Sequence, residues 1–153
     1  MTTHDGLSQK FRTLLGTVVI EFADLESALG WGIEQLLEAP PSQGRIVASY
    51  LTFMEKKDVY RALALDVAAG DEALVSQIAD LCSAIQKTGE DRNRYLHDLW
   101  FSFEGSAVKV EWKKGGDFDP TLVSEDELST FIKLMRALTR ALHDQRDLLA
   151  PPA

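Results

Sequence analysis

The sequence is poor in cysteine and in positive charge. It contains one cysteine, Cys82, among 153 residues, so the chain cannot close a disulfide within itself, and we expect a reducing compartment. Lys and Arg total 16 against 24 Asp and Glu, which gives a net charge of −8. An acidic surface repels phosphate backbones and anionic membranes. Any contact with nucleic acid therefore has to come from a local group of basic residues.

Long apolar runs and a secretory leader are also missing. The first residues, Met1–Asp5, do not show the basic and then apolar pattern of a signal peptide, and no apolar run approaches the roughly 18 residues that span a bilayer. We therefore expect a cytoplasmic protein with no membrane partner.

Several signatures of catalytic and metal sites are absent from the sequence. It has no Gly-rich phosphate loop, no Gly-x-Ser-x-Gly elbow, no paired cysteines and no His-Glu-x-x-His. The three histidines, His4, His97 and His143, are far apart, so we expect neither a metal site nor a cofactor in one chain. Glu21 and Glu26 could be inward carboxylates of a metal-binding bundle, but no Glu-x-x-His accompanies them. We interpret them as solvated or dimer-facing acids.

What is present is a strong helical pattern. The chain is 45% apolar and 26% charged, which suits a single globular domain over residues 1–153. Apolar residues at steps of three or four predict a helix from Leu7 to Leu37, before Pro40 and Pro41. The same spacing predicts a second helix over 46–69, with a break near Met54 and Glu55, and a third from about residue 74 to His97.

After the third predicted helix, apolar residues recur at every second position instead of every third or fourth. The apolar residues Phe101, Phe103, Val108, Val110 and Trp112 alternate with polar ones, which predicts a β-hairpin followed by a loop over 113–117. A capping box at Ser124–Glu127 then begins a last helix that reaches Leu149. The expected fold class is all-α: a bundle of four to five helices with a short β-hairpin between the last two helices.

One segment, Glu90–Asp98, gathers polar side chains at the end of the third predicted helix. On a continuous helix Asn93 and His97 share a face, and Arg92 points about 100° away from Asn93. A helix end or distortion at His97 would bring the three side chains together. A structural interpretation also fits, in which Glu90 pairs with Arg94 and His97 is a polar residue that closes the helix.

The run Arg92–His97 resembles the arginine, polar residue, three residues, histidine motif of the HEPN superfamily. Phe53–Lys57 is similar to the aromatic and lysine stretch in the second helix of small prokaryotic members. The resemblance covers the chain from about Leu7 to Leu149. One departure is Asp98, which stands where such members often have glycine, and which could perturb the turn or hold the imidazole of His97.

The resemblance implies a helical bundle that dimerises, with the motifs of two protomers facing one cleft. Active relatives are metal-independent endoribonucleases, often toxins or defence effectors, so an RNA substrate and a cognate antitoxin or other protein partner are implied. The catalytic residues would be Arg92, Asn93 and His97. Histidine exchanges protons near neutral pH, the arginine fork suits phosphate oxygens, and asparagine can hydrogen-bond the ribose or orient the histidine.

Other residues leave two interpretations open. Arg94, Lys109 and Lys113 could bind the substrate from a basic rim near the hairpin, or the lysines could be solubilising residues on an edge strand. The aromatic residues around the hairpin could stack on bases or pack onto the bundle. The alternatives to an enzyme are a noncatalytic binding or regulatory module and a purely structural dimer that uses the apolar stripe of the first helix.

Overall fold

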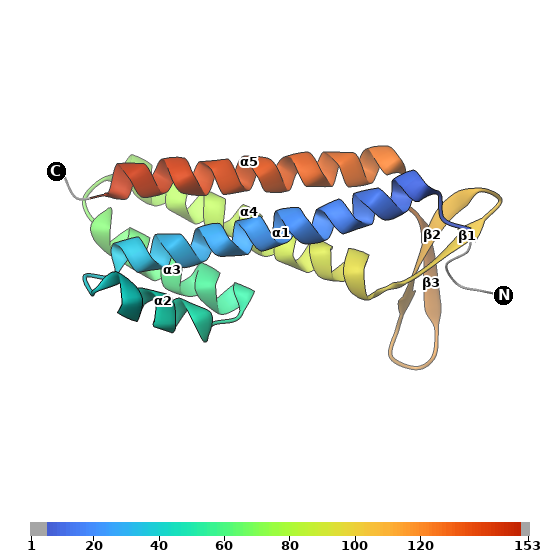
Figure 1. Cartoon of the computed structure of the whole chain (residues 1–153), viewed down its shortest axis with the longest axis horizontal. Coiled ribbons are helices and arrows are strands. Elements are labelled where there is room, and N and C mark those ends of the chain that lie inside the picture. The colour runs from blue at the N-terminus through green and yellow to red at the C-terminus, as the bar shows by residue number, and fades with distance from the viewer. Residues whose placement is uncertain (1–5, 151–153) are drawn as a thin grey trace.

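The computed structural model describes residues 6–150 of the chain, and over this range it contains five helices and one antiparallel sheet (Figure 1). In chain order the elements are α1 (Gln9–Leu36), α2 (Pro41–Ser49), α3 (Phe53–Val67), α4 (Glu72–His97), β1 (Leu99–Phe103), β2 (Ser106–Trp112), β3 (Phe118–Leu122) and α5 (Glu125–Leu149). The mainly helical architecture predicted from the sequence is confirmed.

The apolar stripe of α1 forms the centre of the bundle. Helix α1 packs along α5 and against α3 and α2, and Val18, Leu25, Leu29 and Ile33 are fully buried. Two buried clusters share this stripe, one with α3 and α4 and the other with α5 and Trp100. The idea that the stripe serves as a dimer interface is therefore wrong, because the fold of one chain already covers it.

The boundary between α2 and α3 lies slightly before the predicted break. Helix α2 ends at Ser49, and Thr52 caps α3. The Thr52 hydroxyl accepts a hydrogen bond from the Glu55 backbone N–H, and the Glu55 carboxylate accepts one from the Thr52 N–H, at 2.7 Å. This reciprocal box satisfies helix N–H groups that would otherwise lack partners, and it fixes the break at residues 50–52 rather than at Met54 and Glu55.

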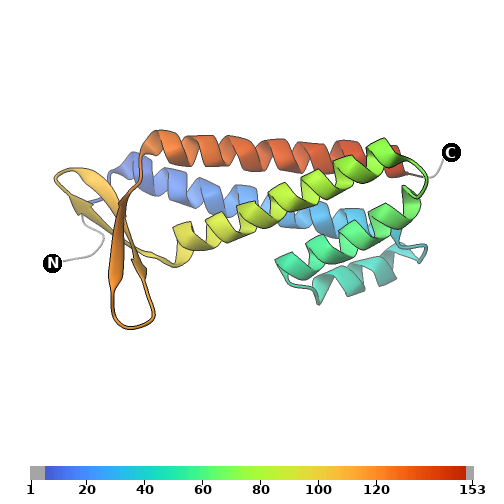
Figure 2. The same cartoon turned by 180° about the vertical axis from the view of Figure 1, so that it is seen from behind.

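The predicted hairpin belongs to a three-stranded sheet with the order β1-β2-β3. Strand β3 was not predicted from the sequence, because Asp119 and Pro120 interrupt its apolar pattern. It pairs antiparallel with β2, from Val108 opposite Leu122 to Trp112 opposite Phe118. The sheet lies across the end of the bundle where α1 and α5 begin and α4 ends, while α2 lies toward the other end (Figures 1 and 2). A single residue, Asp98, joins the end of α4 to β1.

Candidate functional site

The residues Arg92, Asn93 and His97 lie on the last two turns of α4. The helix continues without distortion to His97, and Asp98 leaves it in an extended conformation. Asn93 and His97 are both exposed and share one face, whereas Arg92 is half-buried against the bundle. Helix geometry therefore separates the Arg92 and His97 side chains around the axis within one protomer.

The Arg92 side chain contacts the ring of Phe22 and the side chain of Asn93. Its guanidinium carbon lies 4.5 Å from the centre of the Phe22 ring on α1, and Nη1 donates a hydrogen bond to Asn93 Oδ1 at 3.0 Å. Its Nε is buried and has no hydrogen-bond partner within residues 6–150. The structure thus brings Arg92 and Asn93 into contact through this hydrogen bond.

His97 stands apart from this pair. Its side chain makes no hydrogen bond or ion pair with residues 6–150, and the residue is exposed to solvent. Asp98, which follows it, does not hold the imidazole: Asp98 Oδ2 lies 3.0 Å from Lys109 Nζ. Of the two roles that the sequence left open for Asp98, a contact with the imidazole of His97 is therefore excluded, and the imidazole is available to an external group.

Lys109 lies on β2, the middle strand of the sheet, and not at a rim or on an edge strand as the sequence suggested. Its side chain is 11% exposed and that of Asp98 is 14% exposed. Asp98 Oδ2 has no hydrogen-bond partner among residues 6–150, so it keeps only this ion pair. Because its charge is already matched by Asp98, Lys109 is a weak candidate for binding phosphate.

Arg94 and Lys109 line one pocket of about 320 Å³ between α4, the sheet and α5. Acidic residues outnumber basic ones in its lining, since Asp91, Glu111 and Glu127 face these two cations. The Tyr95 hydroxyl donates to Glu127 Oε1 at 2.8 Å, and burial, followed by this carboxylate, raises the pKa of Tyr95. The two predicted binding residues thus come together, but in surroundings that disfavour an anion.

Lys113, Arg94 and Lys57 each have a partner within the chain. Lys113 is exposed and lies 3.1 Å from Asp119. Arg94 Nη1 pairs with Asp91, at 4.0 Å, and not with Glu90 as the structural interpretation predicted. Lys57, in the stretch resembling the second helix of HEPN proteins, is buried and bonds to Gln86. Lys57 therefore braces α3 against α4.

Glu21 and Glu26 bind cations of the chain itself and do not converge. Glu21 Oε1 accepts from Arg136 Nε at 2.7 Å, and Glu26 Oε1 lies 2.6 Å from Lys56 Nζ. Among residues 6–150, no three histidine, cysteine or acidic side chains gather as a metal would require. None of the helices in that range combines the length and apolarity needed to cross a bilayer.

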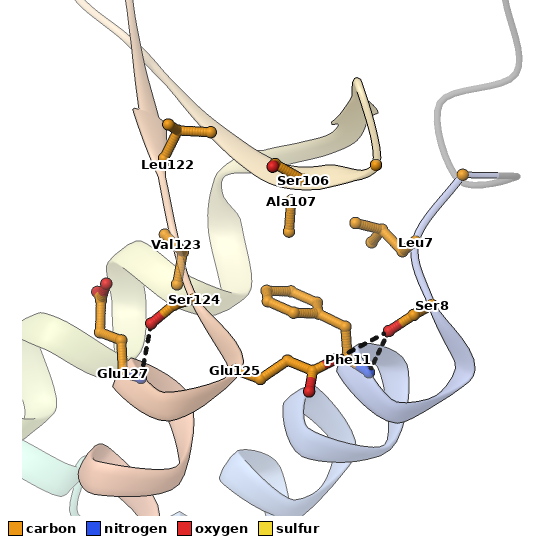
Figure 3. Close-up of a pocket in the computed structure, with 12 residues that line it drawn as sticks. Leu7, Ser8, Phe11, Ser106, Ala107, Leu122, Val123, Ser124, Glu125 and Glu127 are labelled. Carbon is orange, nitrogen blue, oxygen red and sulfur yellow. Dashed lines mark hydrogen bonds between the residues drawn. The ribbon is translucent and has the colours of Figure 1, made fainter.

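A separate pocket of about 610 Å³ lies between the starts of α1 and α5 and the tip of the first hairpin (Figure 3). Ser8 and Ser124, the N-cap residues of the two helices, both line it. Glu125 accepts a hydrogen bond from the Ser8 hydroxyl at 3.2 Å, and its ion pair with Lys10 lowers its pKa. This pocket contains no motif residue, and Glu125 already occupies the positive ends of the helices.

Comparison with protein-family models, curated proteins and solved structures finds no match to this chain.

The different surroundings of His97 and Arg92 predict that alanine substitutions at these two residues change the stability of the protein by different amounts. We expect His97→Ala to change the free energy of unfolding by less than about 0.5 kcal/mol, because the residue is exposed and its side chain has no partner in the described part of the chain. Arg92→Ala removes the contact with Phe22 and should cost about 1 kcal/mol or more. Urea denaturation followed by circular dichroism measures both values. A loss of several kcal/mol in His97→Ala would show that the histidine is a structural residue.

Proposed function

We propose that the chain is a HEPN-like, metal-independent endoribonuclease whose active site is shared between two protomers. The observation that carries the proposal is the arrangement on α4: Arg92 is bonded to Asn93, and one turn further lies His97, exposed and without a partner over residues 6–150. A structural histidine at a helix end would be expected to bond to the chain.

The residue types suit the cleavage of RNA without a metal. The imidazole of His97 would take the proton of a ribose 2′-hydroxyl, and the 2′-oxygen would then attack the adjacent phosphorus. The bond to the 5′-oxygen breaks, and the histidine of the second protomer would protonate that leaving oxygen. Arg92 would stabilise the charge that develops on the phosphoryl oxygens, with its fork oriented by Asn93.

The second protomer supplies what one chain lacks. Arg92 and His97 point to different sides of α4, and one protomer has one motif histidine for two proton transfers. A homodimer would provide two histidines and two arginines. We place this activity in the cytoplasm, with a cognate antitoxin or another protein as the partner that restrains it.

A nuclease assay in the presence of excess EDTA tests the proposal. Purified protein is expected to cut a diverse RNA pool with EDTA present and to leave 2′,3′-cyclic phosphate ends, because the nucleophile is the ribose hydroxyl and the acid and base are side chains. DNA of the same sequences, which lacks that hydroxyl, is the control and should remain intact. Cleavage that EDTA abolishes would contradict the mechanism.

Binding without cleavage would instead favour a noncatalytic module. The acidic lining around Arg94 and Lys109 and the net charge of −8 are the observations that favour this second candidate. An intact RNA pool together with retained RNA binding or a captured protein partner would support it.

A further inference from the structure

A groove of about 360 Å³ lies between the first half of α4 and the last turns of α5, toward the end of the bundle opposite the sheet (Figures 1 and 2). Its lining residues are spaced three or four apart on each helix, so each wall of the groove is one helix face. They include Asp80 and Leu81 on α4 and Ala141, Asp144, Gln145 and Leu148 on α5. The groove is separate from the motif, because Asp80 lies about 25 Å from His97 along α4.

Part of the groove is apolar. Leu148 is 69% exposed and belongs to neither core cluster, while Leu81 and Ala141 beside it are half-buried. A leucine exposed to this extent gains little from the packing of its own chain. Together with its half-buried neighbours, it provides a surface on which an apolar side chain of another molecule can pack.

The groove also contains a buried hydrogen-bond donor. Gln145 is only 5% exposed, and its Oε1 accepts the hydroxyl of Tyr60 at 2.9 Å. Its Nε2 has no hydrogen-bond partner among residues 6–150 and keeps contact with solvent. Because a buried amide normally uses both its oxygen and its nitrogen, Nε2 points to an acceptor that a bound molecule supplies. A peptide carbonyl oxygen is such an acceptor.

Two carboxylates without counter-charges lie on opposite walls of the groove. Asp80 on α4 and Asp144 on α5 are both exposed, and neither forms an ion pair or a hydrogen bond with another residue of the described range. The lining within residues 6–150 contains no lysine, arginine or histidine. By contrast, Glu34 in the pocket between α1 and α2 pairs with Arg45 of the same pocket. The groove between α4 and α5 therefore carries two negative charges that the chain leaves unmatched.

We infer that this groove binds a segment of another protein that carries an apolar side chain between basic residues. The apolar side chain packs on Leu81 and Leu148, and a backbone carbonyl of the segment accepts from Gln145 Nε2. Lysine or arginine side chains of the segment pair with Asp80 and Asp144. The net charge of −8 on this chain attracts such a partner from a distance.

The combination of groups favours a protein segment over other occupants. A small cation would use the two carboxylates but neither the apolar surface nor the Gln145 donor. An uncharged apolar segment would cover Asp80 and Asp144 without giving them a counter-charge, which is costly. The bound segment leaves His97 uncovered, since the groove lies far along α4 from the motif. The inference therefore concerns a docking site and does not depend on the proposed function.

Peptide selection on the full chain tests this docking site. A phage-displayed library of short random peptides is the probe, and the enriched peptides should share an apolar residue between lysines or arginines. Fluorescence anisotropy then measures their dissociation constants. Asp144→Lys should raise these constants at least about tenfold, because it places a like charge against the peptide. Asp24→Lys changes the net charge equally at an exposed residue of α1 outside the groove, and it should leave the constants nearly unchanged.

Further variants test the apolar part of the groove and guard against misfolding. Leu148→Ser should weaken binding, whereas Ile20→Ser, at a residue 63% exposed on α1, should not. Asp80→Lys repeats the charge test from α4, and circular dichroism reports whether each variant keeps its helices. Three results would each overturn the inference: no enrichment of the expected pattern, equal effects of Asp144→Lys and Asp24→Lys, or unchanged binding when serine replaces the apolar residue of the peptide. None of them depends on whether the chain cleaves RNA.

Discussion

Replacing His97 with alanine is expected to lower the rate of RNA cleavage about a hundredfold or more, because the imidazole is the only motif group that can exchange a proton at neutral pH. Arg92→Ala should cause a loss of similar size, since it removes the charge that stabilises the phosphoryl oxygens in the transition state. The double variant should be hardly slower than either single variant, because groups that act as a unit do not contribute additively. Initial rates on one RNA substrate under single-turnover conditions measure these effects.

Matched variants separate this catalytic role from a general change in the protein. His143→Ala removes a histidine that packs beside Trp31 on the far half of α5, and it should keep the wild-type rate. Arg92→Lys retains the charge but loses the fork that bonds to Asn93, so its rate should fall between those of the wild type and Arg92→Ala. Full activity in both His97→Ala and Arg92→Ala would remove the two residues from the mechanism.

The helices were predictable because local signals specify them. Apolar residues at steps of three or four placed α1 within two residues at its start and one at its end, and α4 ends at His97 as predicted. The start of α5 was given by Ser124, whose hydroxyl accepts from the Glu127 N–H at 3.0 Å. Glu127 itself does not complete the capping box, because its carboxylate accepts the hydroxyl of Tyr95 instead.

The orientation of the sheet was not predictable in the same way. Alternation along β1 and β2 identified the two faces but could not show which one meets the bundle, since a strand of either orientation has the same pattern. The orientation is set by Trp100, which was not among the alternating apolar residues. Its ring packs against Phe11 and its indole N–H donates to the Tyr95 carbonyl oxygen, so the face that carries Trp100 meets the bundle. Lys109 is drawn into the interior as a result, although a lysine between two valines predicts an exposed position.

In the candidate site, too, the positions set by helix geometry were predictable, whereas the contacts between residues far apart in the sequence were not. The spacing of Asn93 and His97 correctly placed them on one face of a helix, because helix geometry is local. The contact of Arg92 with Phe22 and the pairing of Asp98 with Lys109 join residues far apart in the sequence. Only the packing of α1 on α4 and the register of β1 with β2 bring those partners together.

The pairing of Lys109 with Asp98 predicts a large loss of stability when one partner is removed. Lys109→Met should lower the free energy of unfolding by about 3 to 5 kcal/mol, because it leaves the Asp98 carboxylate buried without its counter-charge. Urea denaturation at neutral pH measures this value. Asp98→Asn combined with Lys109→Met removes both charges and should recover most of the loss, since the cost arises from the unpaired charge rather than from a missing attraction.

The ion pair of Lys113 with Asp119 provides the matched control for this test. Lys113 Nζ lies 3.1 Å from Asp119, nearly the same distance as between Lys109 and Asp98. The side chains of Lys113 and Asp119, however, are 56% and 59% exposed. Lys113→Met should therefore change the free energy of unfolding by at most about 1 kcal/mol, since water solvates the remaining carboxylate. Equal effects of the two lysine variants would show that Asp98 is solvated in solution. A large effect of Lys109→Met alone would confirm that the ion pair holds the sheet against the end of α4, and with it the position of His97.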